Sequence, residues 1–189
     1  MLTIRPLGDW LDTMNCCPFT SAAGERRHTE PPALYTPEQR RRRDASSWTM
    51  VQGVLAPLQF TIFLASLGLV LHYLATGAGL AAANLSIVVK TLALYTIMIT
   101  GSFWERDVFG RYLFAPAFFW EDVFSMLVLA LHTAWLVALA TGVLAPNSMM
   151  LLALAAYASY IVNATQFLLK LRGARREAAR PRAASAGLV

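Results

Sequence analysis

Four long apolar runs divide this chain of 189 residues and limit what it can fold into. They cover roughly residues 54–75, 81–104, 123–145 and 149–169, and the charged residues crowd outside them. Each run reaches the length of about 20 residues that an α-helix needs to cross the hydrocarbon core of a bilayer. The sequence therefore predicts an all-α integral membrane protein, built as a four-helix bundle.

The distribution of Lys and Arg around these runs predicts the orientation of the chain. Seven precede the first run, two lie between the second and third, six follow the fourth, and the last of the 16, Lys90, lies inside the second. The other two turns hold none, so 15 lie on one side of the membrane, which the positive-inside rule assigns to the cytoplasm. Both termini are therefore predicted to be cytoplasmic. Basic residues beside apolar runs also contact anionic membrane lipids, so the net charge of +5 does not predict nucleic-acid binding.

The apolar runs belong to a predicted membrane domain of residues 34–172. Residues 1–33 mix polar residues, Gly and Pro without periodicity, which predicts a disordered N-terminal extension. Residues 173–189 predict a basic disordered tail. The domain begins with Thr36-Pro37-Glu38-Gln39, a capping pattern typical of the start of a helix.

Two ionisable residues lie deep inside the predicted spans. Lys90 stands nine residues into the second run and His132 nine residues into the third. Each is then about 14 Å from the start of its span, near the middle of a core about 30 Å thick, where the two side chains would meet. Ionisable groups at this depth are candidates for function. The alternatives are that Lys90 extends to the outer surface and that His132 bonds to a neighbouring helix.

Amide and hydroxyl side chains follow one face of the first and last spans. Gln52, Gln59 and Ser66 recur at seven-residue intervals, and Asn163 and Gln166 lie in the final span. Hydrogen bonding between helices is the ordinary role of such groups in membrane bundles, and we favour it here. Asn163 and Gln166 are retained as candidate substrate contacts.

Four carboxyl groups flank a single aromatic loop. Glu105 and Asp107 end the second span, while Glu121 and Asp122 begin the third, next to the aromatic residues 118–120. Partial removal from water favours the protonated form of a carboxyl group, which makes it available as a general acid near neutral pH. The structural alternative is that acids at a helix start interact with the helix dipole.

Three stretches of the chain resemble one known family. They are residues 34–60 (LYTPEQRRRRDASSWTMVQGVLAPLQF), residues 88–136 and residues 155–172. The block FGRYLFAPAFFWEDVFS, residues 109–125, is the most specific part. Over residues 34–172 the chain is similar to the 2-vinyl bacteriochlorophyllide hydratases.

That resemblance implies a hydro-lyase of bacteriochlorophyll biosynthesis. Such an enzyme adds water across the C3 vinyl group of chlorophyllide a or 3-vinyl bacteriochlorophyllide a, giving a 1-hydroxyethyl group. The chemistry needs no cofactor and no protein-bound metal. The expected partners are the tetrapyrrole, water and membrane lipids. Two further alternatives are a homo-oligomer and contact with other pigment-biosynthesis enzymes. The resemblance also implies a multi-pass protein of the bacterial inner (intracytoplasmic) membrane.

Hydration of a vinyl group requires a proton on the terminal carbon and a water molecule at the inner carbon. We expect Glu121 to be the acid, and Asp122, Glu105 or Asp107 to orient the water. His132 is a candidate ligand of the substrate magnesium. It lies about 16 Å along the helix from Glu121, farther than a metal lies from a vinyl group in one ring, so the two roles compete.

Further substrate contacts follow from the position of the loop. Arg106 and Arg111 are expected to pair with the substrate propionate through charge-assisted hydrogen bonds, and Trp120 to anchor the loop at the interface. Lys90, Asn163 and Gln166 complete the set of candidate contacts.

Two other functions fit parts of the sequence. A non-catalytic membrane pigment carrier or assembly scaffold would use His132 and the aromatic loop only to hold a chlorophyllide. A cytochrome b-type anchor ranks last, because His72 lies near the external end of the first span and His132 near the midplane, which makes them poorly matched as two axial ligands of one haem.

Overall fold

The computed structural model describes residues 34–186, with side chains described as far as Arg175. These residues form five α-helices and no strand, which confirms the predicted all-α class. The helices are α2 (Pro37–Ala45), α3 (Ser47–Thr76), α4 (Leu80–Phe109), α5 (Phe119–Thr141) and α6 (Pro146–Ala186). Within the described part, α3 to α6 are each long and apolar enough to cross a membrane, as the four runs predict.

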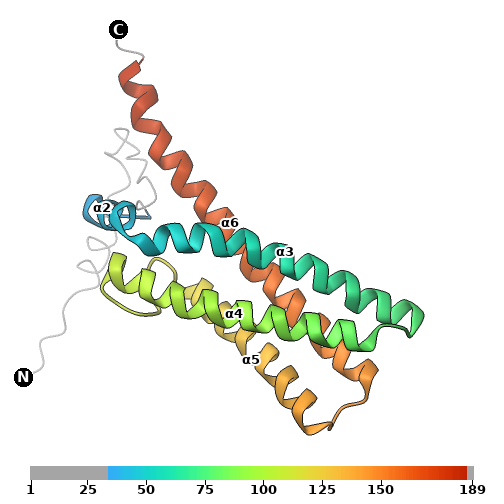
Figure 1. The fold of residues 1–189 in the computed structure, drawn as a ribbon. Coiled ribbons are helices and arrows are strands. Elements are labelled where there is room, and N and C mark those ends of the chain that lie inside the picture. Colours follow the sequence, from blue (N-terminus) through green and yellow to red (C-terminus); the bar gives the residue numbers. More distant parts are fainter. Residues whose placement is uncertain (1–33, 187–189) are drawn as a thin grey trace, which may run out of the picture. The chain divides into compact units, whose positions relative to one another are not determined.

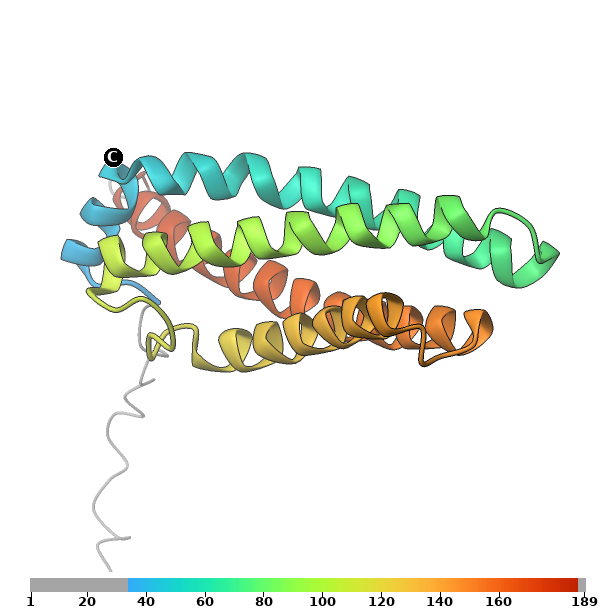
Figure 2. The same cartoon turned by 60° about the horizontal axis from the view of Figure 1, so that its bottom comes forward.

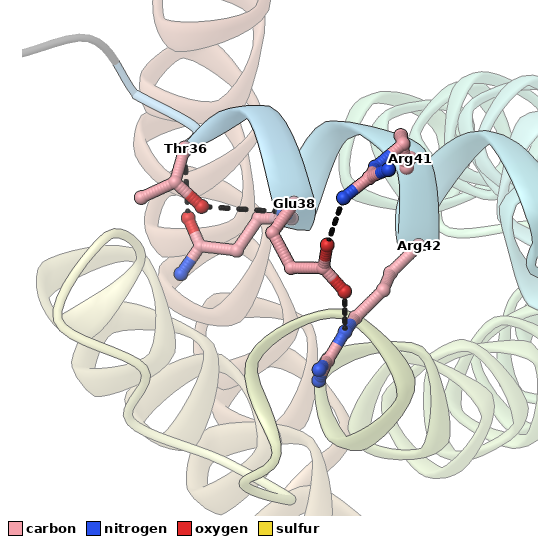
Figure 3. A network of polar contacts seen from close by, with 5 residues as sticks. Thr36, Glu38, Arg41 and Arg42 are labelled. Carbon is pink, nitrogen blue, oxygen red and sulfur yellow. Dashed lines mark hydrogen bonds and ion pairs between the residues drawn. The ribbon is translucent and has the colours of Figure 1, made fainter.

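The short helix α2 begins where the capping pattern predicts. The Thr36 hydroxyl accepts a hydrogen bond from the Gln39 backbone N–H, and the Gln39 side chain accepts one from the Thr36 N–H. In the same first turn, Glu38 forms ion pairs with Arg41 at 2.5 Å and Arg42 at 3.1 Å, as Figure 3 shows. The helix is thus stabilised by its own side chains, and it packs against α4.

The four long helices form two antiparallel hairpins, α3 with α4 and α5 with α6 (Figures 1 and 2). The first hairpin turns at Gly77 and Gly79, whose φ angles of 72° and 85° lie in the left-handed region that glycine adopts readily. The hairpins pack together through α3 against α6 and α4 against α5. Helices joined by short turns are expected to be antiparallel neighbours.

The helices extend beyond the apolar runs at one end of the bundle. Helix α3 starts at Ser47, and α4 continues to Phe109, which carries the acidic segment at 105–107 onto the helix. Helix α6 continues to Ala186, through a segment for which the sequence predicts disorder; its Ala and Arg residues have high helix propensity. The prediction of disorder for residues 1–33 lies outside the described residues.

Large apolar side chains occupy both the inside and the outside of the bundle. The interior includes Phe63, Val70, Ile87, Trp135 and Tyr157, each at most 2% exposed. The outer faces carry side chains such as Leu64, Leu92 and Val137, each more than half exposed. Apolar residues on both sides are expected of a bundle surrounded by lipid. A polar group inside this bundle therefore requires a specific explanation.

Candidate active site

The loop of residues 110–118, which joins α4 to α5, folds back onto two carboxyl groups. The Phe114 backbone N–H donates to Asp122 Oδ2 at 2.7 Å, and the Ala115 N–H donates to Glu105 Oε2 at 3.2 Å. Phe114 adopts a left-handed backbone conformation, with φ at 58°. Both carboxyl groups are buried. The loop thus brings together two acids that come from different helices.

Glu105 and Asp122 also lie close enough to each other for their carboxyl groups to interact electrostatically. Both groups are buried, and removal from water favours the protonated form of a carboxyl group. Two neighbouring negative charges would also repel each other. Burial and repulsion together favour a pair in which one carboxyl group is protonated.

Glu121 has a different partner, the Lys170 ammonium on α6. Lys170 Nζ donates to Glu121 Oε2 at 2.6 Å and also to the Ala117 carbonyl. The same ammonium lies 4.8 Å from the centre of the Phe118 ring. Because Lys170 and Glu121 both interact electrostatically with Asp122, the ion pair adjoins the acid pair.

The sequence alone does not point to Lys170 as part of the site. As the first basic residue after the fourth run, it reads as a topology signal. The charge distribution does predict that Lys170 and the loop lie on the same side of the membrane. It does not predict which acidic residue Lys170 contacts.

The other predicted residues near the loop lie at its rim. Asp107 is exposed and accepts a hydrogen bond from Ser46 Oγ at 2.8 Å, so it does not join the buried acids. Arg106 is exposed, with its guanidinium 4.9 Å from the Tyr112 ring centre. Arg111 and Trp120 are exposed as well. These side chains are available to a ligand that approaches from outside the bundle.

A cluster of aromatic rings packs around Phe118, the last residue of the loop. Phe118 is 2% exposed and packs against Trp104 and Phe109 with ring centres 5.6 and 5.7 Å away. Phe167 of α6 stacks on it at 5.9 Å, and Tyr35 contacts it at 6.3 Å. These rings exclude water from one side of the carboxyl groups. The sequence analysis did not identify Tyr35 or Phe167.

Lys90 and His132 both lie inside the bundle, where they interact electrostatically with each other. Lys90 is fully buried, with Nζ 3.6 Å from the Tyr160 ring centre, so it does not extend to the outer surface. His132 Nδ1 bonds to the Val128 carbonyl of its own helix at 2.8 Å, and not to a neighbouring helix. The two alternatives, a Lys90 that extends to the outer surface and a His132 that bonds to a neighbouring helix, are therefore wrong.

Several of the polar residues on the helix faces do bond between helices, as predicted. Gln52 donates to Thr100 at 2.8 Å, and Asn163 Nδ2 donates to Ser125 Oγ at 2.8 Å. Gln166 lies one turn from Asn163, partly buried. Among residues 34–175, no group of His, Cys, Asp and Glu side chains is arranged to hold a metal ion.

The chain was compared with known proteins. Residues 35–173 match the family model described as 2-vinyl bacteriochlorophyllide hydratase (BCHF). A protein named 2-vinyl bacteriochlorophyllide hydratase from Cereibacter sphaeroides is 64% identical over 158 residues, which cover 84% of this chain and 94% of that protein. One with the same name from Rhodobacter capsulatus is 62% identical over 147 residues, which cover 78% and 85%. No solved structure matches the chain significantly. The chain therefore belongs to the 2-vinyl bacteriochlorophyllide hydratase family.

Proposed function

We propose that this protein is a hydro-lyase that adds water to the C3 vinyl group of chlorophyllide a or 3-vinyl bacteriochlorophyllide a during bacteriochlorophyll biosynthesis. The names of relatives that are 62% and 64% identical support the reaction. The observation that carries the chemistry is the buried carboxyl pair of Glu105 and Asp122. The reaction consumes one water molecule and forms one 1-hydroxyethyl group, and the substrate is neither oxidised nor reduced overall.

The first step is protonation of the terminal vinyl carbon by the Glu105–Asp122 pair. The positive charge that develops on the inner carbon is delocalised over the macrocycle. The loop N–H groups that bond to both acids stabilise the pair after the proton has left, because they donate to the carboxylate form.

The second step is capture of water at the inner carbon. Glu121 accepts the proton that this water loses, because its carboxyl group adjoins the acid pair and is held in place by the Lys170 ammonium. Transfer of that proton back to the acid pair closes the cycle. The assignment exchanges the role that the sequence suggested for Glu121, and the physical reason is its contact with a cationic side chain.

The macrocycle lies in the bilayer beside the loop, with its propionate at the headgroups. Arg106 and Arg111 are exposed there and pair with the propionate, while Trp120 offers an exposed ring at the same level. This arrangement does not use His132 as a ligand of the substrate magnesium, because that side chain lies about 16 Å along α5 from Glu121. The charge distribution supports cytoplasmic termini and the inner (intracytoplasmic) membrane as the location.

The test is incubation of membranes that contain this protein with a 3-vinyl chlorophyllide. We expect a product heavier by one water, and its loss when Glu105 and Asp122 are both changed to amides. Pigment that co-purifies with the unaltered protein without gaining water would instead support a carrier or scaffold.

A further inference from the structure

Helix α6 carries a buried or partly buried polar or aromatic side chain at every turn from the middle of the bundle to the loop. These residues are Tyr157, Tyr160, Asn163, Gln166 and Lys170. From the first to the last they span 13 residue steps, or about 20 Å along the helix. This buried face winds around α6, because positions three residues apart are offset by about 60°, and α6 lies against both α3 and α5 (Figure 2).

Polar contacts with α5 mark the half of this face nearest the loop. Lys170 bonds to Glu121 at 2.6 Å, and Asn163 bonds to Ser125 at 2.8 Å. Ser125 lies one turn after Glu121 on α5. The two contacts are therefore successive levels of one polar column.

The inner half of the face meets side chains of the other helices. The Tyr160 ring lies 3.6 Å from Lys90 Nζ of α4. The Tyr157 hydroxyl shares a hydrogen bond of 2.5 Å with Ser66 of α3, and its ring centre is 5.9 Å from that of His132 on α5. All four long helices thus contribute to the column.

Buried polar atoms along this column have no hydrogen-bond partner among the described residues. They are both amide atoms of Gln59, Lys90 Nζ, His132 Nε2, Asn163 Oδ1 and Gln166 Oε1. Gln59 belongs to the column because it lies one turn before Phe63, whose ring centre is 4.9 Å from that of Tyr160. The unpaired atoms include donors and acceptors.

Each such atom costs about 1–3 kcal/mol if it remains unpaired, and native proteins rarely leave buried polar groups in that state. Ordered water is the usual partner, and an internal water needs two to four polar neighbours. An acidic side chain is not the partner of Lys90, because no described carboxyl group forms an ion pair with it. The mixture of donors and acceptors on four helices suits water better than an ion of one charge.

The inner end of the column is closed by apolar side chains. One turn beyond Ser66, Lys90 and His132 lie Val70, Ile87 and Trp135, all fully buried. Trp135 is fixed by a hydrogen bond from its indole N–H to the Met149 carbonyl at 3.1 Å. This apolar layer interrupts the polar column on the side away from the loop, with the buried Asn84 Oδ1 one turn beyond Ile87.

We propose that ordered water molecules bind along this column and supply the water that adds to the vinyl group. A hydratase whose substrate lies in lipid needs a store of water beside its acid and base. The column provides that store from within the bundle, and its apolar end prevents a continuous path of water across the membrane. The use of this water rests on the proposed function, whereas its binding does not.

Radiolytic hydroxyl-radical labelling of the protein in lipid nanodiscs tests the water directly. X-rays form radicals from bound water, and these oxidise the side chains next to it. We expect oxidation of Phe63 and Tyr160, although they are only 2% and 8% exposed. Phe60, three residues from Phe63 and 48% exposed to lipid, is the matched control and should remain unlabelled. Absence of label from Phe63 and Tyr160 would overturn the proposal.

A pair of glutamine variants tests the link to the reaction. Gln59→Leu removes two unpaired atoms, so labelling of Phe63 and the rate of hydration should both fall severalfold, with the KM for pigment unchanged. Gln52→Leu, at the paired position seven residues earlier, should leave the labelling unchanged. If Gln59 had only a structural role, Gln59→Leu would change stability and leave the labelling as it was.

The two proposals fail separately. If Phe63 is labelled but the protein does not hydrate pigment, the water column is supported and the proposed function is contradicted. If the protein hydrates pigment but the side chains of the column are not labelled, the proposed function is supported and the water column is contradicted.

Discussion

The carboxyl groups of Glu105 on α4 and Asp122 on α5 interact electrostatically, and each accepts a backbone hydrogen bond from the loop that joins the two helices. The loop closes on the pair only if both oxygens are present as acceptors. Structure and chemistry at this point therefore depend on the same atoms, and variants must keep the shape of the carboxyl group to separate the two.

Glu105→Gln should abolish hydration while the protein still inserts and binds pigment. The amide keeps the size and an acceptor oxygen for the Ala115 N–H but cannot protonate carbon, so turnover should fall about 100-fold or more. The measurement is the rate of water addition per folded molecule. Asp107→Asn, at an exposed acid two residues away, is the control and should retain normal turnover. Equal losses in both variants would contradict the acid pair.

Lys170→Met should impair both stability and catalysis. It leaves the buried Glu121 carboxylate without its counter-ion, which costs on the order of 3 kcal/mol. Thermal unfolding in detergent should detect this cost. Adding Glu121→Gln to Lys170→Met should restore stability but not hydration. A double variant as unstable as Lys170→Met would show that the two side chains act independently.

Arg106→Gln combined with Arg111→Gln should weaken pigment binding and leave the chemical step intact. Because both side chains are exposed, the KM should rise by roughly tenfold with little change in kcat. The same two changes at Arg40 and Arg41 of α2 form the control. An unchanged KM would mean that the propionate binds elsewhere and that these arginines serve only as topology signals.

Tyr35→Ala should loosen the aromatic cluster, at a cost of about 3 kcal/mol, whereas Tyr35→Phe should retain the packing. Burial raises the pKa of the Tyr35 phenol, an effect that the nearby Arg43 guanidinium partly offsets. A raised folded-state pKa means that Tyr35 contributes stability below a pH of about 10, the unfolded value, and loses it as the pH rises further. Unfolding scans at alkaline pH should show a larger loss in the unaltered protein than in Tyr35→Phe.

Reporter fusions should find the turns near Gly77 and Asn147 in the periplasm and a fusion after Arg172 in the cytoplasm. An even number of spans returns the chain to the side on which it began. A periplasmic signal after Arg172 would contradict the predicted orientation of the four spans.

The fold could be predicted because hydropathy and capping are local properties. The four runs and the Thr36 cap each depend on neighbours within a few residues, and all of them appear in the structure. The start of α5 is harder to predict, since its N-cap residue Phe118 makes no side-chain capping bond. Packing of aromatic rings around Phe118 defines that helix end instead.

The candidate site could be predicted only in part. The acids were found because they flank one loop, but their pairing depends on how α4 and α5 rotate about their axes. Which acid has Lys170 as its partner depends on α6 continuing as a helix past the apolar run. The spacing of residues 105, 121, 122 and 170 along the sequence predicts neither the rotation of α4 and α5 about their axes nor the length of α6.

The bond from Lys170 to Glu121 also has a consequence for the order of assembly. Helix α6 is made after the other three long helices, so a nascent chain that has inserted α3, α4 and α5 still lacks the counter-charge of Glu121 and one ring of the aromatic cluster. The site becomes complete only when α6 has been made and has packed against α5. A chain that stops before Phe167 would therefore lack both contacts.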